Sequence, residues 1–557
     1  MLLLEKLPIE ILHRIFNYLD SYDIFYSLQN INTHLNQILH TYNRYQVNFQ
    51  SISMSQFYFT LQRINPQQII SLTLSNMDDT PDQIRLFLNF FSLKQFLHLE
   101  VLQLLQPPNT NDFNKILSDL QTNKTLKSLT ILHCQSSSVN QQTFQILSSF
   151  INNSKSLRRL SLSGTLNSLF EYQFNSSVDY LYFNDNIFNT LSLPTIASRM
   201  PNLIFLDTAI TTKSNSYHLS LFNHLTRLIL TTFIEMTKFE MENLLKSMPK
   251  LLFFKLTANG KQWFNGQFWE QCLPLTVEIF EFNFCTQLQN LNVEIILETF
   301  QTSFWLDIKH WYVMLDYQMN PTMVHLYSLP FCDTQFYYRP SIDPIQQCRS
   351  SITVNQICMK NVTKLTLDLS TLNSERKHLI SDSSHYFPNV STLILTDYGC
   401  HLSTELVVDF LQSILDFTHI TDLKLGQFHH PEFIRILYNR MPSLKFLRIT
   451  ETLLIDLDMI DFSNIHSLTI CDCLSNIERI HLLFPHIKYL CVRLITFENI
   501  RKLFEYFGQN LRNITFRHIN QDLKEVTIKW LSNYCNQHHR RYSYDIDQHM
   551  DLHIWLD

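Results

Sequence analysis

Histidine and cysteine pairs are the residues of this chain whose spacing could do chemistry. His549 and His553 stand four residues apart, which would place them on one face of a helix, where two histidines can share a zinc ion. The adjacent pairs His429–His430 and His538–His539, and the Cys471-x-Cys473 pair, are further candidates. None has a third ligand at a suitable spacing, and no HExxH motif occurs, so these pairs are better interpreted as surface or structural residues.

Glycine scarcity excludes several further classes of active site. Only 6 of 557 residues are glycine, whereas phosphate-binding loops, dinucleotide-binding turns and nucleophile elbows all need glycine for close backbone approach or positive φ. No serine, histidine and aspartate set can be assembled from spacing, because such triads are defined by geometry. We therefore expect no catalytic residues, no bound metal and no cofactor. An enzyme built from convergent acids or a metal in the tryptophan-rich middle of the chain is the remote alternative.

Charge and composition limit the partners. Lysine and arginine total 43 against 49 aspartate and glutamate, which gives a net charge of -6 and no basic stretch suited to a phosphate backbone. No apolar run reaches membrane-spanning length, and Glu5 comes too early for a signal peptide. The 11 cysteines include no CxxC pair, which suits a reducing compartment. These features predict a soluble protein of the cytoplasm and/or nucleus, without nucleic-acid or membrane partners.

A nine-residue pattern led by proline occurs five times. Each copy has Met or Phe, then Pro, then apolar residues at fixed spacing: MPNLIFLDT from Met200, MPKLLFFKL from Met248, FPNVSTLIL from Phe387, MPSLKFLRI from Met441 and FPHIKYLCV from Phe484. Proline cannot continue a helix, so each copy predicts the end of one helix and the start of the next strand.

The pattern contains a wider L-x-x-L-x-L frame that occurs about sixteen times, at spacings of roughly 21 to 31 residues. In MPSLKFLRI the frame residues are Leu444, Leu447 and Ile449, which we expect to face a core, while Phe446 and Arg448 face the other side of the strand. Such a repeat predicts an α/β fold: a curved leucine-rich-repeat solenoid with parallel strands inside and helices outside.

Helix starts are predicted between the strands by a hydroxyl side chain followed three residues later by Gln or Glu. The three candidates are Thr80 with Gln83, Ser138 with Gln141, and Thr237 with Glu240.

The frame fits poorly over residues 286–361, which we expect to hold irregular repeats or an inserted hairpin. Trp263, Trp269, Trp305 and Trp311 lie in or just before this region, and we interpret them as core filling rather than a ligand-anchoring patch. The C-terminal LHIWLD predicts a last strand that closes the exposed end of the repeats.

Residues 1–45 form a separate head, ahead of repeats at 46–557. Apolar residues at helical spacing follow Pro8, and Asp20 and Ser21 break the pattern. Asn32 is expected to cap a third helix, so the sequence predicts three short helices. About forty residues rarely make a self-sufficient core, and the head carries more large apolar residues than so small a core can cover. The alternative is an amphipathic N-terminal segment that only caps the repeats.

The order and spacing of the head residues resemble an F-box. The matching run is Leu7-Pro8-x-Glu10-Ile11-Leu12-x-x-Ile15-Phe16-x-Tyr18-Leu19, followed by Asp23, Leu28, Asn32 and Leu35; the tryptophan that many members have in the third helix is absent. The resemblance implies that the head binds the adaptor of SCF-type cullin-RING ubiquitin ligases, and through it a cullin. The positions that match the adaptor-binding face are Leu7, Pro8, Ile11, Leu12, Ile15, Phe16 and Leu19.

A target-binding surface is predicted on the strand positions that face away from the core, on the concave side of the repeats. These positions are rich in aromatic and basic side chains, the types enriched at interface hot spots: Tyr180, Tyr182, Phe205, Arg227, Phe253, Lys255, Arg448 and Arg493. We therefore expect a substrate-recognition subunit of an SCF-type ubiquitin ligase that binds a target protein through this surface. The alternative is a leucine-rich-repeat scaffold without a role in ubiquitin transfer.

Overall fold

The computed structural model describes residues 7–557 except 30, 136–137, 184–192, 211–221, 234–235, 288–291, 320–321, 341–347, 352–356, 371–384, 397–403, 427–430, 456–461, 495 and 548–549. The chain divides into two compact units. Unit 1 comprises Met1–Phe253, His539–Asp545 and Ile554–Asp557, and unit 2 comprises Phe254–His538 and Ile546–His553. The predicted head is part of unit 1, so its boundary at residue 45 stays a prediction.

Three short helices open unit 1, as the sequence predicts: α1 (Ile9–Phe16), α2 (Ser21–Leu28) and α3 (Thr33–Thr41). Side-chain caps define two of the starts. The Asp20 carboxylate accepts a hydrogen bond from the backbone N–H of Tyr22 at 2.9 Å, and Asn32 Oδ1 accepts one from the N–H of Leu35 at 2.8 Å. These caps satisfy backbone donors that have no partner in the first helical turn.

The core of the head continues into the first strand. The ring of Phe16 meets that of Tyr42 edge-on at 5.3 Å, and Tyr42 meets Tyr45 of β1 at 4.8 Å. The Ser21 hydroxyl donates to the carbonyl of Gln46 at 2.6 Å. Burial raises the pKa of the Tyr45 phenol above its usual range, and its hydroxyl donates to the carbonyl of Leu39 at 2.9 Å. The three helices are therefore packed on β1 and not only tethered to it.

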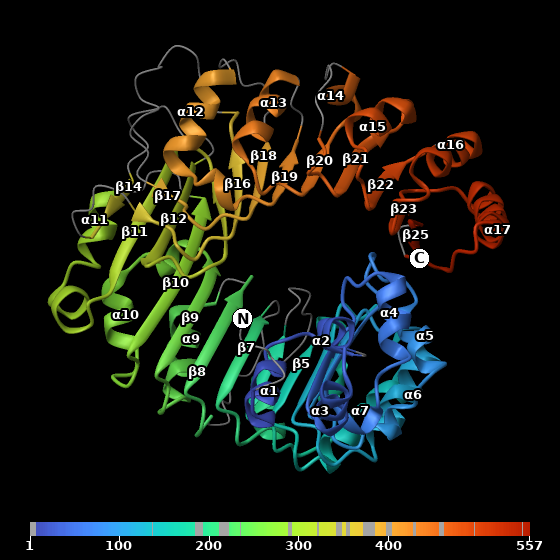
Figure 1. The fold of residues 1–557 in the computed structure, drawn as a ribbon. Coiled ribbons are helices and arrows are strands. Elements are labelled where there is room, and N and C mark those ends of the chain that lie inside the picture. The colour runs from blue at the N-terminus through green and yellow to red at the C-terminus, as the bar shows by residue number, and fades with distance from the viewer. Residues whose placement is uncertain are drawn as a thin grey trace. The chain divides into compact units, whose positions relative to one another are not determined.

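Unit 1 is built from strands that pair in parallel in the order of the sequence, with helices between them (Figure 1). The strands are β1 (Tyr45–Asn48), β2 (Ile69–Ser75), β3 (Val101–Leu105), β4 (Ser128–Leu132), β5 (Arg159–Leu162), β6 (Tyr180–Phe183), β7 (Phe205–Ile210) and β8 (Arg227–Thr232). The α-helices after the head are α4 (Met54–Leu61), α5 (Gln83–Leu88), α6 (Thr110–Leu120), α7 (Gln141–Asn153), α8 (Leu193–Arg199) and α9 (Lys238–Lys246).

Unit 2 has the same strand–helix alternation around an antiparallel interruption. Its strands are β9 (Phe253–Asn259, all but the first residue), β10 (Ile279–Gln287), β11 (Tyr312–Met319), β12 (Thr322–Leu329), β13 (Gln335–Tyr338), β14 (Cys348–Ser350), β15 (Ile357–Cys358), β16 (Lys364–Asp368), β17 (His385–Tyr386), β18 (Thr392–Thr396), β19 (Asp422–Leu425), β20 (Phe446–Ile449), β21 (Ser467–Cys473), β22 (Tyr489–Arg493) and β23 (Asn513–Phe516). Its helices are α10 (Gly266–Cys272), α11 (Val293–Glu298), α12 (Thr404–Ile414), α13 (Pro431–Arg440), α14 (Glu451–Ile455), α15 (Ile477–Leu483), α16 (Phe497–Phe507) and α17 (Gln521–Gln537).

All sixteen frames of the sequence lie on strands, namely β2 to β10, β16 and β18 to β23. The predicted alternation is confirmed in β20, where Leu447 and Ile449 are buried and Phe446 and Arg448 are exposed, and Leu444 is buried just before the strand. The chain is therefore a mixed α/β protein with long runs of parallel strands, each strand having one core face and one open face.

The five proline-led copies share a buried residue before the proline. Four of them follow a helix as predicted (α8, α9, α13 and α15), whereas the copy at Phe387 follows the short strand β17, so the prediction of a helix end is wrong there. The residue before each proline, Met200, Met248, Phe387, Met441 or Phe484, is buried. In the three Met copies its carbonyl accepts a hydrogen bond from the N–H of the next frame leucine, as between Met441 and Leu444 at 3.1 Å. The Met or Phe side chain thus fills the core where the chain turns into the next strand, which accounts for the repeated pattern.

The helix starts follow the sequence in one case out of three. Thr237 and Glu240 form the predicted reciprocal capping box of α9. α7 is capped two residues later than predicted, by Asn140 with Thr143. In the third case Gln83 caps nothing: its side chain accepts from the N–H of Ser75 at 3.0 Å and donates to the carbonyl of Phe49 at 2.8 Å. It links β2 to the residue that follows β1 instead, because a buried amide can satisfy both a donor and an acceptor.

The irregular region contains the hairpin that the sequence allowed. β11 and β12 pair antiparallel, and β12 lies antiparallel beside β10. Trp263, Trp269 and Trp305 are fully buried and Trp311 nearly so, and each indole N–H donates to a backbone carbonyl at 3.0 to 3.2 Å. These tryptophans fill the core around the hairpin, which confirms the core-filling interpretation.

The C-terminal strands β24 (Tyr542–Ile546) and β25 (Leu552–Leu556) include the predicted last strand. Within unit 1 they pack on the first repeats. Trp555 is fully buried with its ring 5.4 Å from that of Phe57 on α4, and the Arg541 guanidinium lies 4.2 Å from the ring centroid of Tyr58. The two ends of the chain therefore meet inside one compact unit.

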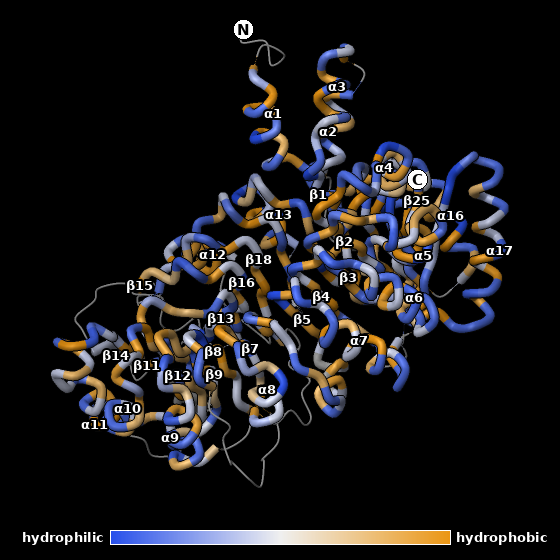
Figure 2. The backbone as a smooth tube through the Cα atoms, turned by 90° about the horizontal axis from the view of Figure 1, so that it is seen from below, coloured by the Kyte–Doolittle hydropathy of each residue, from blue (hydrophilic) through white to orange (hydrophobic). Residues whose placement is uncertain are grey.

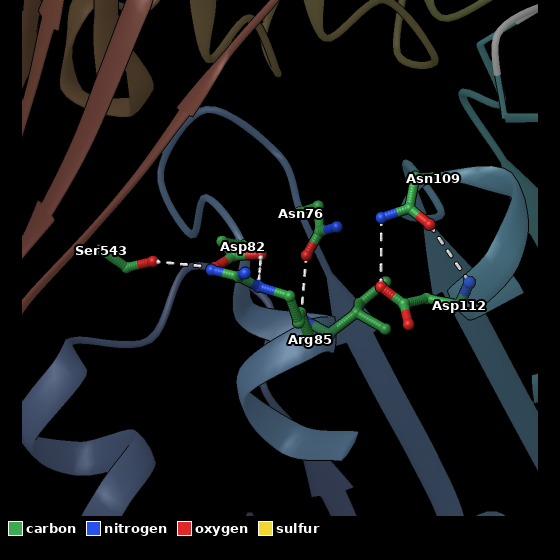
Figure 3. Close-up of polar contacts among 7 residues, drawn as sticks. Asn76, Asp82, Arg85, Asn109, Asp112 and Ser543 are labelled. Carbon is green, nitrogen blue, oxygen red and sulfur yellow. Dashed lines mark hydrogen bonds and ion pairs between the residues drawn. The ribbon is translucent and has the colours of Figure 1, made fainter. Parts of the chain in front are cut away.

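A polar contact also joins strand β24 to the first repeats (Figure 3). The Ser543 hydroxyl donates to the Asp82 carboxylate at 3.4 Å across 461 residues of sequence. Asp82 is also bound by Arg85, whose Nε lies 2.9 Å and Nη2 2.5 Å from its oxygens.

Across the described residues, no helix is long and apolar enough to cross a membrane.

Candidate interaction surfaces

Of the residues whose spacing suggested metal chemistry, those that the structure describes are not assembled into a site. His538 and His539 are exposed, whereas His553 is buried and its Nδ1 lies 3.1 Å from the Thr515 hydroxyl. His429, His430 and His549 lie outside the described residues. Cys471 and Cys473 are half-buried on β21. Over the part of the chain that the structure describes, no three His, Cys, Asp or Glu side chains come close enough to hold a metal ion.

A buried polar cluster in unit 2 is the nearest arrangement to a catalytic one. The Tyr327 hydroxyl lies 3.0 Å from the Asp316 carboxylate and 2.9 Å from His385 Nε2, which is itself 3.2 Å from Asp316. Asp316, the most accessible of the three, is 7% exposed. No substrate can reach groups so deeply enclosed, so the cluster is best explained as mutual satisfaction of buried polar atoms.

The residues implied as the adaptor-binding face divide between surface and core. Pro8, Ile11 and Leu19 are exposed, and Leu7 and Ile15 are half-buried. Leu12 and Phe16 are only 0% and 2% exposed because they point between the three helices. These two positions build the core of the head and offer no contact surface, which corrects their assignment to a binding face.

The head leaves an unusual amount of apolar surface uncovered. Of the 22 large apolar side chains that are strongly exposed among the described residues, 6 lie between residues 9 and 31. They are Ile9, Ile11, Tyr18, Leu19, Tyr26 and Ile31. In Figure 2 the helices α1 and α3 project from the strands of unit 1, with apolar segments along them. Exposed apolar side chains gathered on one small element are typical of an interaction site.

A second candidate surface lies on the open face of the strands in unit 1. Arg159, Tyr180, Phe205 and Arg227 are register partners on β5, β6, β7 and β8, so they form one row across the strands. Phe253 extends it, because its N–H and that of Leu252 both bond to the carbonyl of Thr226. We call these five residues the Arg–aromatic row. The sequence predicted the alignment of four of them, and the strand register confirms it.

Neighbours in the Arg–aromatic row contact one another. The Arg159 guanidinium lies 5.1 Å from the ring centroid of Tyr180, and the Arg227 guanidinium lies 5.8 Å from Phe205 and 4.6 Å from Phe253. Such distances are within the range of cation–π attraction. Tyr182 packs on Phe205 at 4.5 Å, so Phe205 is 6% exposed and supports the row more than it displays itself.

Four of the predicted target-binding residues do not join this row. Tyr182 is paired with Ser161 and Asp207, at another register position of the same strands. Lys255 belongs to unit 2, where its ammonium is paired with Asp333 at 2.6 Å. Burial would lower the pKa of Lys255, but the nearby Cys332 and Asp333 outweigh it and raise that pKa. Arg448 and Arg493 are exposed on β20 and β22 at different register positions, with β21 between them.

No protein-family model matches this chain, and no curated protein matches it. Among solved structures, it is similar to the leucine-rich repeat-containing protein LegL7 from Legionella pneumophila, with 14% sequence identity over 72% of this chain and 96% of that one and a TM-score of 0.21. A likeness with so low a TM-score carries no argument about fold or function. The fold described above therefore rests on strand order and repeat spacing alone.

The sequence prediction missed Arg159. It occupies the same frame position as Tyr180, Phe205, Arg227 and Phe253, namely the residue before the second apolar position of the frame. A comparison of the residues at this one position across all the frames identifies Arg159 from the sequence. The same position holds Ser71, Val101 and Ser128 on β2 to β4, so the row of large side chains begins at β5.

Proposed function

We propose that this protein is a non-enzymatic substrate-recognition subunit of an SCF-type ubiquitin ligase, acting in the cytoplasm and/or nucleus. In this proposal, residues 1–45 are an F-box that binds the adaptor and through it a cullin, and residues 46–557 are a leucine-rich-repeat solenoid that binds a target protein. Ubiquitin transfer is done by other subunits. The chain contributes proximity, since tethering makes the encounter of a target lysine with the ubiquitin carrier effectively intramolecular.

The observation that carries the proposal is the uncovered apolar surface of the head. Ile9, Ile11 and Leu19 are each about 40% exposed although neighbouring Leu12 and Phe16 are fully buried. A three-helix unit that leaves such side chains in water gains stability when a partner covers them, at about 25 cal/mol for each Å² of apolar surface removed from water. The motif that resembles an F-box spans the same helices, so sequence and surface point to one partner-binding face.

The test is adaptor capture by a variant that changes only surface residues. The double substitution Leu7→Ala and Pro8→Ala alters a half-buried and an exposed position at the start of α1. We expect it to abolish pull-down of a purified SCF adaptor while circular dichroism remains unchanged. Phe239→Ala, which truncates a 70% exposed ring on α9, is the matched control and should bind normally. Retained adaptor binding by the double variant would remove the basis for the ligase assignment.

One observation favours the alternative of a scaffold without a ligase role. The head is packed on the first repeat: the Gln68 side chain donates to the carbonyls of His40 at 2.7 Å and Tyr42 at 2.9 Å, and the Phe25 ring lies 4.9 Å from that of Tyr45. A segment that caps the repeats would show such contacts. The scaffold proposal predicts a monodisperse full-length protein in the absence of adaptor, whereas the receptor proposal predicts self-association through the exposed head.

A further inference from the structure

We propose that the Arg–aromatic row binds an extended peptide segment of the target that carries two anionic side chains four residues apart, with an apolar or aromatic side chain between them. In one-letter form the segment is Z-x-Φ-x-Z, where Z is a carboxylate or a phosphorylated residue and Φ is apolar. This inference rests on the proposed target-binding role of the repeats and specifies which chemistry that role selects.

The spacing follows from the strand register. Arg159 on β5 and Arg227 on β8 are three strands apart in one row. Neighbouring strands lie about 4.8 Å apart, so the two side chains leave the sheet roughly 14 Å apart. An extended peptide rises about 3.3 Å per residue, and residues at even spacing point to the same side. Residues i and i+4 of a peptide that crosses the strands therefore match the two arginines in both distance and direction.

The charge of the two arginines is available to a ligand. Over the described residues, neither Arg159 nor Arg227 forms an ion pair, and both are exposed. By contrast, the adjacent Arg158 is paired with Asp179 at 3.7 Å and donates to the carbonyl of Ser177 at 3.2 Å. An arginine without an anion on the protein itself can offer its full fork of N–H donors to a carboxylate or phosphate.

The aromatic rings orient these guanidinium groups. Arg227 lies between the rings of Phe205 and Phe253, and Arg159 lies against Tyr180. A ring contact occupies the flat face of a guanidinium and leaves its N–H edges free, so the group is held ready for bidentate binding. Holding the side chain in place before binding reduces the entropy that binding would otherwise lose.

The centre of the row favours an apolar residue in the peptide. Between the two arginines lie the half-buried Tyr180 on β6 and Phe205 on β7, and the half-buried Tyr182 of β6 packs beside Phe205. The side chain at position i+2 points to the same side as those at i and i+4, and it falls on this aromatic surface. Rings of this kind supply contact area at small loss of side-chain freedom.

A peptide fits these features better than a nucleic acid does. The chain carries a net charge of -6, and the row offers two separated cations instead of a continuous basic track. Nucleic-acid affinity depends on many neutralised phosphates, which two arginines cannot provide. Two isolated anions on an otherwise uncharged segment are the simplest complement to the row.

The inference is tested by fluorescence anisotropy with labelled peptides and the full-length protein. Peptides carry a central Phe and two Glu residues spaced i,i+2, i,i+4 or i,i+6, and a second set has phosphoserine in place of Glu. We expect tightest binding at i,i+4, and the two sets distinguish carboxylate from phosphate recognition. Binding that does not depend on spacing, or tighter binding of a single-stranded oligonucleotide of similar length, would overturn the inference.

Variants assign the effect to the row. Arg159→Glu and Arg227→Glu should each weaken the i,i+4 peptide by roughly tenfold or more, the usual loss for a charge-assisted contact at an interface. Arg158→Glu is the matched control, because it reverses the same charge one residue away, and it should bind the peptide within about twofold of the unmodified protein. Arg227→Glu should regain affinity for a peptide with Lys at one Z position. Equal losses in Arg158→Glu and Arg227→Glu would show that only bulk charge matters and would overturn the inference.

Adaptor pull-down on the same variants separates the two proposals. Loss of peptide spacing dependence with normal adaptor capture refutes the peptide inference and leaves the ligase proposal standing. Loss of adaptor capture with normal peptide binding refutes the ligase proposal and leaves the peptide inference standing.

Discussion

Trp555 is expected to hold the two ends of the chain together, and its truncation gives a sharp test of the packing in unit 1. The side chain is fully buried, and its ring lies 5.4 Å from that of Phe57 on α4. An indole buries about 150–250 Å², which at about 25 cal/mol per Å² corresponds to roughly 4–6 kcal/mol as an upper bound. Replacement of a buried Trp by Ala usually lowers the free energy of unfolding by about 3–5 kcal/mol.

Hydrogen exchange measured by mass spectrometry locates this loss. If α4 (Met54–Leu61) opens when the Trp555 contact is lost, a loss of about 3–5 kcal/mol speeds amide exchange in α4 by roughly 10²-fold to 4 × 10³-fold, at about 1.4 kcal/mol per tenfold change. Trp555→Ala should therefore speed amide exchange in both α4 and β24 (Tyr542–Ile546), although these elements are more than 480 residues apart in sequence. Unchanged exchange in α4 would refute the claim that the last strand stabilises the first repeats.

Two matched substitutions sharpen the test. The indole N–H of Trp555 is buried without a hydrogen-bond partner among the described residues, which is unfavourable by about 1–3 kcal/mol. Trp555→Phe keeps a ring on Phe57 and removes that donor, so it should lower stability far less than Trp555→Ala. Trp530→Ala truncates a half-buried tryptophan on α17, in unit 2, and should leave exchange in α4 unchanged.

Three further outcomes follow from the local chemistry. Burial lowers the pKa of His325 below the ordinary histidine value of about 6.5, so below that pH the unfolded chain takes up a proton at this imidazole more readily than the folded chain does. Stability should therefore fall as the pH drops below about 6.5, and His325→Gln should flatten chemical-denaturation midpoints between pH 7 and 5; an unchanged pH slope would contradict this. Burial raises the pKa of Cys285 to about 11 and that of Cys332 to about 12, so at pH 8 an alkylating agent should label the exposed Cys358 before these two. Peptide mapping that finds earlier modification of Cys285 would be a contrary result. Thr237→Ala removes the reciprocal cap of α9 and should lower the free energy of unfolding by about 1 kcal/mol in denaturant melts, whereas no change would mean that the helix end is satisfied by water.

The placement of the strands could be predicted from the sequence, because it depends on neighbours along the chain. Every L-x-x-L-x-L frame lies on a strand, and in MPSLKFLRI the buried and exposed sides alternate as expected. A period of two fixes which side chains share a face, and parallel pairing in sequence order then aligns equivalent positions of successive frames. That is why Tyr180, Phe205 and Arg227 could be placed in one row from the sequence, and why Arg159 could have been added to it.

Helix starts were less predictable, since several side chains compete for the same backbone donors. Thr237 with Glu240 caps α9 as expected, but Asn140 takes the role expected of Ser138. Gln83 is engaged by Ser75 of β2 and by Phe49, the residue after β1, so its partners depend on contacts that no local pattern contains. A short polar motif shows that a cap is available and does not decide which residue provides it.

The amino-acid sequence by itself determined the repeat, the strand faces and the three helices of the head, because each is encoded by hydrophobic spacing and turn residues within about thirty positions. Tertiary structure alone decided that Leu12 and Phe16 face the core of the head while Ile11 remains exposed, that β12 inserts antiparallel beside β10, and that Trp555 packs on Phe57. The physical reason is the range of the interaction. Periodicity specifies which side of an element is apolar, but which other surface buries that side depends on packing among segments far apart in the chain.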